Sequence, residues 1–312
     1  MGAFVIRRLW QVIPTMVGVI LLVFFLFNVV GGDPSYLLAG KISSPQQIAM
    51  IREQLGLDQP QYIQLLIFFK QVLTFDFGIS WSTYEKVSSL FASRLPASLM
   101  LGLSLLVVET IISVLIALAV AYVRGSLTDR AIMVSCTVAQ SVSILVYIIV
   151  FQYFFAYKLG LFPVQGWGES FWVNLLKYSA LPILIGVCVS LAPNIRLYRT
   201  FLLDEIGQDY VRTARAKGLS ENRVMLVHVL RNAGIPIVTT LMIQLPLLLI
   251  GLFLIERFFS IPGIGREIIL AVERSDFPVI KAITVYVALA TLLANLLADI
   301  MYKLVDPRVK LQ

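Results

Sequence analysis

No charged residue interrupts the stretch at residues 131–157, which reads AIMVSCTVAQSVSILVYIIVFQYFFAY. A helix needs about 20 residues to cross a hydrocarbon core of about 30 Å, so this stretch is long enough to span a membrane. Five further apolar runs have a similar character and lie at residues 9–32, 95–123, 178–195, 232–255 and 282–298. The chain is therefore predicted to be an all-α integral membrane protein with six transmembrane helices.

The composition supports this prediction. Of the 312 residues, 59% are hydrophobic and 14% are charged, whereas soluble proteins average about 45–50% apolar and about 25% charged residues. The chain has two cysteines, both inside apolar runs, and one histidine, so neither a disulfide framework nor a Cys/His zinc site is expected. The net charge of +7 contains no block of like charges, which favours membrane orientation over nucleic-acid binding.

Two apolar segments have a competing interpretation. Residues 9–32 follow Arg7 and Arg8, as the apolar part of a signal peptide would. This run exceeds the usual length of about 7–15 residues, and no small-x-small cleavage site follows it before Asp33, so a membrane span is favoured. Residues 64–75 are apolar but short and contain Lys70, which is more typical of an interfacial or packed helix than of a span.

Six spans place both termini on the same side of the membrane, and the basic residues indicate which side. More than half of the 25 lysines and arginines fall in the segments that are inside when the N-terminus is inside, although the outer segments are longer in total. Because basic residues concentrate in cytoplasmic loops, the chain is predicted to have an N-in, C-in topology.

The first outer segment, residues 33–94, is long enough to form a structure of its own. Clusters of Gly, Pro and Asp punctuate it, and residues 44–55 and 62–73 have helical apolar spacing. It is predicted to be a small helical cap, and the alternative is a loop that only ties two helices together. The chain then divides into the tail and first helix at 1–32, this cap, and a core of five helices at 95–312.

The inner segment at residues 196–231 has the pattern helix, glycine stop, helix. Gly218 follows basic residues, as expected at a helix C-terminus, and Ser220 can cap the next helix. The short helix before Gly218 contains both small and basic residues. The small residues would let another surface approach closely, and the charges would fix how that surface is aligned. One interpretation is a docking surface for a cytoplasmic partner, and the other is a solvated charged loop that obeys the positive-inside rule.

Residues 211–219, VRTARAKGL, resemble the cytoplasmic signature loop of the inner-membrane permease subunits of ABC importers. More narrowly, the chain resembles the dipeptide/oligopeptide/nickel permease family in its B-type branch. Further motifs of that branch occur in the same order: LGLDQP at 55–60, RLPASL at 94–99, FSIPGIGR at 259–266, DFPV at 276–279 and DPR at 306–308. Together these motifs extend the resemblance over nearly the whole chain.

The resemblance implies a type I importer fold in the bacterial inner membrane, with the cap in the periplasm and with a homologous second permease beside this chain. It also implies two cytoplasmic ATPase subunits, which bind ATP and Mg²⁺, and a periplasmic substrate-binding protein. This chain itself is then expected to hold no cofactor and to be a transporter subunit, not an enzyme. The ATPase-coupling residues that the resemblance implies are Asp209, Tyr210, Arg212, Thr213, Ala214, Arg215, Ala216, Lys217 and Gly218.

The sequence departs from the family pattern in two places. Arg212-Thr213-Ala214 stands where the general importer signature has Glu-Ala-Ala, so the groove of the partner is expected to be more acidic. Ser141-Val142-Ser143 stands where the third span usually carries Ser-x-Pro. Without that proline, the third helix is expected to be straighter.

Polar residues inside the spans are the candidates for the translocation path. The chain has no P-loop, because Ser35 stands where the first glycine before Gly40 would be required, so ATP hydrolysis must come from another chain. An acidic side chain near the middle of a span, such as Glu109, has a high free-energy cost of insertion. Glu109 shares a helix face with Ser113. It is therefore expected either to touch substrate or to make a structural hydrogen bond. The remaining candidates are Ser141, Ser143, Thr240, Gln244 and Asn295.

The leading functional hypothesis is a permease subunit of an ATP-driven importer for di- or oligopeptides. Nickel chelates, glutathione and oligosaccharides stay open as substrates within the same family. The alternative is an ion-gradient-coupled secondary carrier, in which Glu109 would be the coupling carboxylate. Carriers often contain inverted repeats, and the sequence shows no internal symmetry of that kind.

Overall fold

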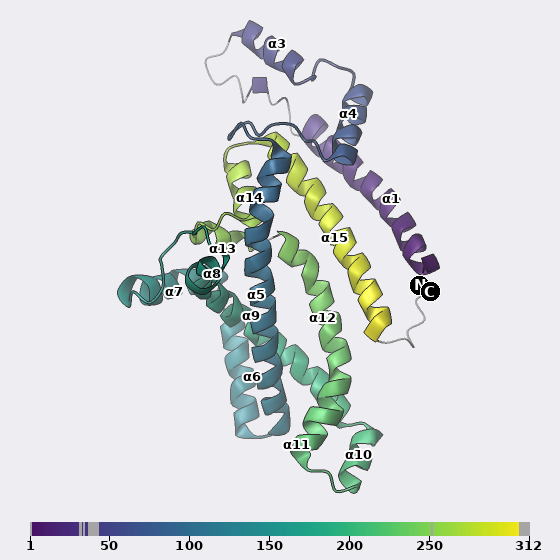
Figure 1. Cartoon of the computed structure of the whole chain (residues 1–312), viewed down its shortest axis with the longest axis vertical. Helices are drawn as coiled ribbons and strands as arrows, with labels where there is room; N and C mark the ends of the chain where they lie inside the picture. The colour runs from purple at the N-terminus through teal and green to yellow at the C-terminus, as the bar shows by residue number, and fades with distance from the viewer. Residues whose placement is uncertain (1, 31–32, 34, 37–43, 251, 306–312) are drawn as a thin grey trace.

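The computed structural model describes residues 2–30, 33, 35–36, 44–250 and 252–305, and this part of the chain is mostly helical. Within it, the only β-type pairing is an isolated bridge between Ile79 and Lys86. Figure 1 shows long helices, with α3 (Pro45–Gln54) and α4 (Gln61–Thr74) at one end of the molecule and α10 (Asp209–Ala216) and α11 (Glu221–Arg223) at the opposite end. The predicted all-α architecture is confirmed.

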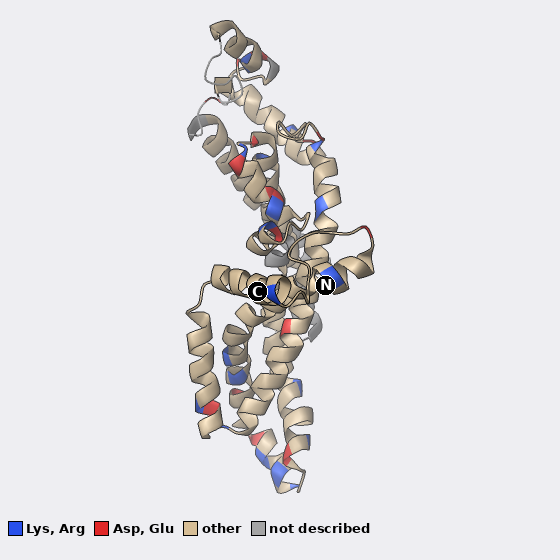
Figure 2. Cartoon of the chain, turned by 90° about the vertical axis from the view of Figure 1, so that its left-hand side faces the viewer, with Lys and Arg blue, Asp and Glu red and all other residues tan. Residues whose placement is uncertain are grey.

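Five helical segments are long and apolar enough to cross a membrane. They are formed by α1 (Gly2–Phe25) with η1 (Leu26–Val30), α5 (Val87–Tyr122), α9 (Ala180–Ile206), η4 (Val224–Val229) with α12 (Leu230–Ile250), and α15 (Phe277–Val305). The long helices contain few charged residues, whereas the end that carries α10 contains both basic and acidic residues (Figure 2). Five of the six predicted spans are confirmed, and residues 64–75 fall in the short helix α4, as expected for a non-spanning segment.

The third predicted span is sharply bent. α6 (Leu127–Gln140) meets α7 (Ile144–Phe151), which continues into η2 (Gln152–Lys158), at an angle of 92°, so the expectation of a straighter helix is wrong. The Ser141 hydroxyl donates to the carbonyl of Thr137 at 3.1 Å, while Ser143 has an extended backbone and its hydroxyl accepts from the amide of Leu145 at 3.3 Å. These serines end one helix and cap the next without a proline. The bent pair counts as the sixth span when its two arms are taken together.

α5 and α9 form the best-packed helix pair in the core. Leu101 of α5 and Leu181 and Ile185 of α9 are at most 1% exposed and belong to one apolar cluster. At Gly186 the helices approach so closely that a Cβ atom would lie 1.9 Å from Leu105 Cδ1. Small residues permit such contacts between membrane helices, where van der Waals packing drives association.

The outer cap consists of α3 and α4, and it rests on α1. A capping box starts α3: Ser44 Oγ accepts from the amide of Gln47 at 3.3 Å, and Gln47 Oε1 accepts from the amide of Ser44 at 3.1 Å. The ring of Phe68 in α4 lies 6.5 Å from that of Phe24 in α1, within a shared buried cluster. The two helices predicted in this segment are confirmed.

Short helices connect the long helices of the core. α8 (Phe171–Val173) and η3 (Asn174–Tyr178) precede α9, while α13 (Phe253–Phe258) and α14 (Ile264–Glu273) connect α12 to α15. The fifth span was predicted to reach residue 255, but α12 ends at Ile250 and a separate helix begins at Phe253. This correction places the FSIPGIGR motif at 259–266 in the turn after α13 and in the first residues of α14.

Candidate functional site

The signature loop folds as the short helix α10, directly after the inner end of α9. α9 ends at Ile206, α10 occupies Asp209–Ala216, and α11 begins at Glu221 after a turn. Figure 1 places α10 and α11 at the end of the molecule opposite the cap. This position is the one expected for a surface that meets a cytoplasmic partner.

One face of α10 is buried in the core of this chain. Val211 and Ala214 are 0% and 5% exposed, and they belong to a cluster that includes Tyr198 and Leu202 of α9 and Met225 of η4. Ala214 is one of the coupling residues that the family resemblance implies. The structure directs it inward, so its contribution is to seat α10 on the core.

Two polar side chains tie α10 to its neighbours. The Tyr210 hydroxyl donates to Glu205 of α9, and burial raises the pKa of Tyr210 to about 12, so the phenol keeps its proton at neutral pH. Arg215 makes a bidentate ion pair with Glu221 of α11, with Nε to Oε2 at 3.0 Å and Nη2 to Oε1 at 2.6 Å. This hydrogen-bonded pair raises the pKa of Arg215, although solvent reaches both side chains and weakens the attraction.

Gly218 closes the turn after α10. Its φ of 77° lies in the left-handed region, and its amide donates to the carbonyl of Arg215 at 2.9 Å. The amide of Leu219 donates to the carbonyl of Ala214 at 3.4 Å, so the last carbonyls of the helix are satisfied. The predicted glycine stop is confirmed. Ser220 has the extended backbone of an N-cap, but its side chain makes no capping hydrogen bond to α11.

The outward face of α10 and of the turn after it consists of small residues and of charged residues that are mainly basic. Its exposed residues are Asp209, Arg212, Thr213, Ala216, Lys217 and Gly218. Arg212 and Asp209 form a surface ion pair at 3.4 Å, which contributes little to stability. The face therefore offers Arg212 and Lys217 to an acidic partner surface without disturbing the buried side of the helix.

Glu109 lies inside the chain, between α5 and α9. Its side chain is buried, and its carboxylate accepts from Ser113 Oγ at 3.3 Å and from the side-chain amide of Asn194 in α9. Of the two roles left open by the sequence, this geometry favours the structural hydrogen bond between helices. Sequence reasoning missed Asn194, and the signal that could have found it is an isolated amide within an apolar span.

The other path candidates are dispersed over the remaining helices. Ser141 and Ser143 are exposed at the bend between α6 and α7, and Asn295 is exposed on α15. Thr240 and Gln244 are partly buried on α12, where the Thr240 hydroxyl donates to a carbonyl of its own helix at 3.0 Å. Among the described residues no hydrogen bond joins these groups to one another. They form no single site within this chain.

Two buried carboxylates that sequence reasoning missed hold the outer loops in place. Asp276 accepts from Ser80 Oγ at 2.5 Å, and further hydrogen bonds from the same loop surround it. Glu256 accepts from Ser98 Oγ at 2.8 Å and from the amide of Arg266 at 3.0 Å, while burial raises the pKa of Glu256. Both residues lie in or beside the motifs that carried the resemblance, so those motifs mark anchors of the outer surface.

The chain matches two family descriptions that together cover nearly its whole length. Residues 113–311 match the binding-protein-dependent transport system inner membrane component. Residues 1–102 match the N-terminal part of the binding-protein-dependent transport system membrane component. Neither description supports the alternative of an ion-gradient-coupled carrier.

Individual proteins resemble the chain from end to end. The dipeptide transport system permease protein DppB of Escherichia coli K12 is 34% identical over 333 residues, covering 98% of both chains. The glutathione transport system permease protein GsiC of Salmonella choleraesuis is 35% identical, with 98% of both chains covered. A probable peptide ABC transporter permease protein of Sinorhizobium fredii is 32% identical over 99% of this chain and 100% of its own length. The chain is therefore a multi-pass inner-membrane permease subunit, not itself an enzyme, and it belongs to the family of binding-protein-dependent transport system inner membrane components.

Proposed function

We propose that this permease subunit imports di- or oligopeptides. The names of three similar proteins supply the support, since they refer to dipeptide, peptide and glutathione, which are all peptide compounds. In the complete transporter, this chain pairs with a homologous second permease, and two cytoplasmic ATPase subunits bind ATP and Mg²⁺. A periplasmic binding protein delivers the peptide, and this chain holds no cofactor of its own.

The observation that carries the coupling role is the division of α10 into two faces. Val211 and Ala214 seat the helix on the core, while Arg212 and Lys217 are exposed on the other side. Tyr210 is tied to α9, and Arg215 is tied to α11, which leads into α12. When ATP closes the ATPase pair, a displacement of α10 would therefore be transmitted to two spans at once. Such coupling requires contacts that differ between the two states of the transporter.

We propose the N-in, C-in topology for the assembled transporter, with residues 33–94 as the periplasmic cap that receives the binding protein. This arrangement is supported by the placement of α3 and α4 at the end of the molecule opposite α10 (Figure 1). Residues 95–312 form the core permease, and residues 196–231 form its coupling loop.

The translocation path is proposed to run between this chain and the second permease. Exposed Ser141, Ser143 and Asn295 have the polarity needed for such a surface, and partly buried Thr240 and Gln244 lie on the neighbouring helix α12. Glu109 supports the path indirectly, because it holds α5 to α9 through Asn194.

The test is to extract the chain from its native membrane in mild detergent and to identify the co-purifying proteins by mass spectrometry. We expect ATPase subunits and a second permease, and ATP-dependent uptake of labelled di- and oligopeptides after reconstitution with the binding protein. Recovery of the chain alone, with transport driven by an ion gradient, would overturn the proposal. Uptake of a nickel chelate or an oligosaccharide in place of peptides would overturn the substrate class only.

A further inference from the structure

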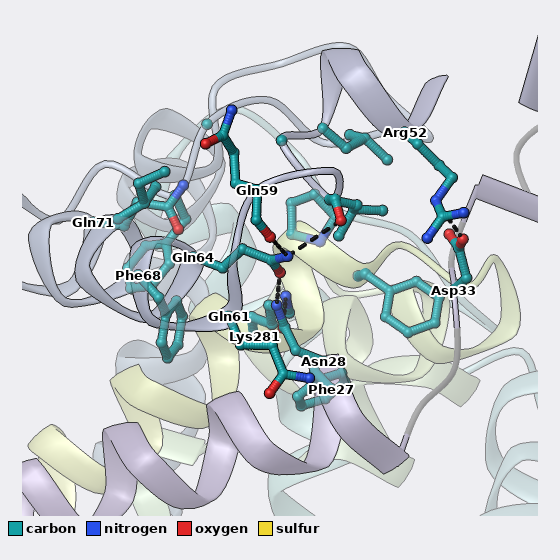
Figure 3. A pocket seen from close by; sticks show the side chains of 18 of the residues that line it. Phe27, Asn28, Asp33, Arg52, Gln59, Gln61, Gln64, Phe68, Gln71 and Lys281 are labelled. Atoms are coloured by element: carbon teal, nitrogen blue, oxygen red, sulfur yellow. Dashed lines mark hydrogen bonds and ion pairs between the residues drawn. The ribbon is translucent and has the colours of Figure 1, made fainter. Parts of the chain in front are cut away.

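A cavity of about 740 Å³ lies beneath the outer cap, and the proposed function does not use it. Figure 3 shows side chains from η1, the cap and α15 converging around this space. Its volume falls within the range of about 300–1,000 Å³ that is common for small-molecule sites. The polar groups of its lining therefore indicate what it can bind.

Lys281 is the principal charged group of the cavity. Its Nζ donates to Asn28 Oδ1 at 2.8 Å and lies 5.9 Å from the ring centres of Phe27 and Phe68. The Asn28 amide in turn donates to Gln64 Oε1 at 2.8 Å. An ammonium group has three donors, and within the described part of the chain a single hydrogen bond engages this one.

Among the described residues that line the cavity, one positive charge has no anionic partner. The charged lining residues are Asp33, Arg52 and Lys281. Asp33 pairs with Arg52 at 2.9 Å, and none of the ion pairs between described residues includes Lys281. Placing a cation away from water is costly unless an anion accompanies it, so the cavity is suited to one negatively charged group.

The proposed topology, on which this inference rests, places the cavity at the outer membrane interface. Asn28 and Lys281 are at the outer ends of the spans Trp10–Asn28 and Phe277–Leu297. Part of its lining is apolar and exposed: Ile67 of α4 is 46% exposed, and Ile79 is 54% exposed. A ligand with an anionic head and an apolar tail fits this combination of charge, depth and apolar border.

We propose that this cavity binds an anionic phospholipid of the outer leaflet, with its phosphate at the Lys281 ammonium and its acyl chains along the exposed apolar residues of the lining, Ile67 and Ile79. Basic groups at the interface attract anionic lipids in general. Here the enclosure by the cap and the fixed position of Lys281 turn that attraction into a defined site. The bound lipid would link η1, α4 and α15, so the cap would depend on the lipid composition of the membrane.

The test uses the intact complex with its co-purifying subunits, titrated with short-chain phosphatidylglycerol and followed by native mass spectrometry. Phosphatidylcholine of the same chain length is the reference lipid. Lys281→Gln removes the charge but keeps a donor for Asn28, and we expect roughly tenfold weaker binding of phosphatidylglycerol. The matched control is Lys158→Gln, since Lys158 is exposed at the end of η2, outside the cavity, with its Nζ 5.7 Å from the Phe154 ring centre. This variant should bind the lipid as the wild type does.

Equal binding of phosphatidylglycerol to the wild type and to Lys281→Gln would overturn the proposal. It would also be overturned if a dipeptide with a free C-terminal carboxylate displaced the lipid and its C-terminal amide did not, because the cavity would then be a substrate site. Lys281→Arg keeps the positive charge and should restore lipid binding. If it failed to do so in a complex that elutes normally, the role of the charge would be disproved.

Discussion

Gly218 shows how one residue fixes the shape of the coupling loop. Its φ of 77° costs an L-residue roughly 1–2 kcal/mol. Its position is otherwise open, because a Cβ atom would have no neighbour within 4 Å. A side chain at this position would therefore strain the turn without a collision, and the strain would be borne by the end of α10.

Gly218→Val should insert into the membrane at the normal level but lose peptide uptake several-fold, while the ATPase subunits continue to hydrolyse ATP. Uptake and ATP hydrolysis are to be measured on the same reconstituted sample. Gly125→Val is the matched control, since Gly125 has the same φ of 77° and an equally open position in another turn. If both variants lost uptake equally, backbone strain alone would explain the loss in Gly218→Val, and the coupling role would be contradicted.

Glu109 provides a second test at the residue scale. Glu109→Gln keeps a side-chain oxygen that can accept from Asn194 and Ser113, so uptake and thermal stability should stay near wild-type values. Glu109→Leu leaves the buried amide of Asn194 without its acceptor and should destabilise the protein by about 1–3 kcal/mol. Thermal unfolding followed by size-exclusion chromatography measures the loss. If Glu109→Gln were stable but inactive, the carboxylate itself would belong to the path.

The contact between α5 and α9 can be tested at the scale of whole elements. Gly186→Ala forces a Cβ atom against Leu105 and should lower stability by about 1–3 kcal/mol, which the thermal midpoint of the purified complex would report. Gly234→Ala is the control, because Gly234 also lies in a helix but a Cβ atom there meets nothing within 4 Å. The double variant Gly186→Ala with Leu105→Ala should recover part of the loss. A stable Gly186→Ala variant would show that the two helices shift apart at little cost.

Local pattern explains why most elements were predicted and why one was not. The apolar runs indicate where helices cross the membrane, and the turn residues between them indicate where they stop. The bend between α6 and α7 depends on two serine hydroxyls. The Ser141 hydroxyl donates a hydrogen bond to the local backbone, and the Ser143 hydroxyl accepts one from it. The third span was expected to be straighter because it lacks the proline of the family pattern, and this was wrong because serine hydroxyls can end one helix and cap the next without a proline.

At the scale of the whole molecule, hydrogen bonds between residues far apart in the sequence were the hardest contacts to predict. Lys281 meets Asn28 across 253 residues, and Asp276 meets Ser80 across 196 residues. No local pattern reports such pairs, because each partner alone is an ordinary polar residue in a loop or at a helix end. The coupling loop could be recognised in the sequence because its residues are contiguous. The sequence did not indicate which side of α10 faces outward, and the burial of Ala214 in the structure identifies that side.

Assembly of the whole transporter supplies the last prediction. The exposed cations Arg212 and Lys217 should attract an acidic groove of the ATPase, so the double variant Arg212→Glu with Lys217→Glu should lose its ATPase subunits during purification. Charge-assisted contacts contribute about 1.5–3 kcal/mol each, so reversing two charges should also abolish most peptide uptake. Arg130→Glu reverses an exposed charge at the start of α6 and should retain the subunits. Quantitative mass spectrometry of the purified complexes measures the recovery of the ATPase subunits. If the double variant retained as much ATPase subunit as the wild type, α10 would dock by shape and not by charge.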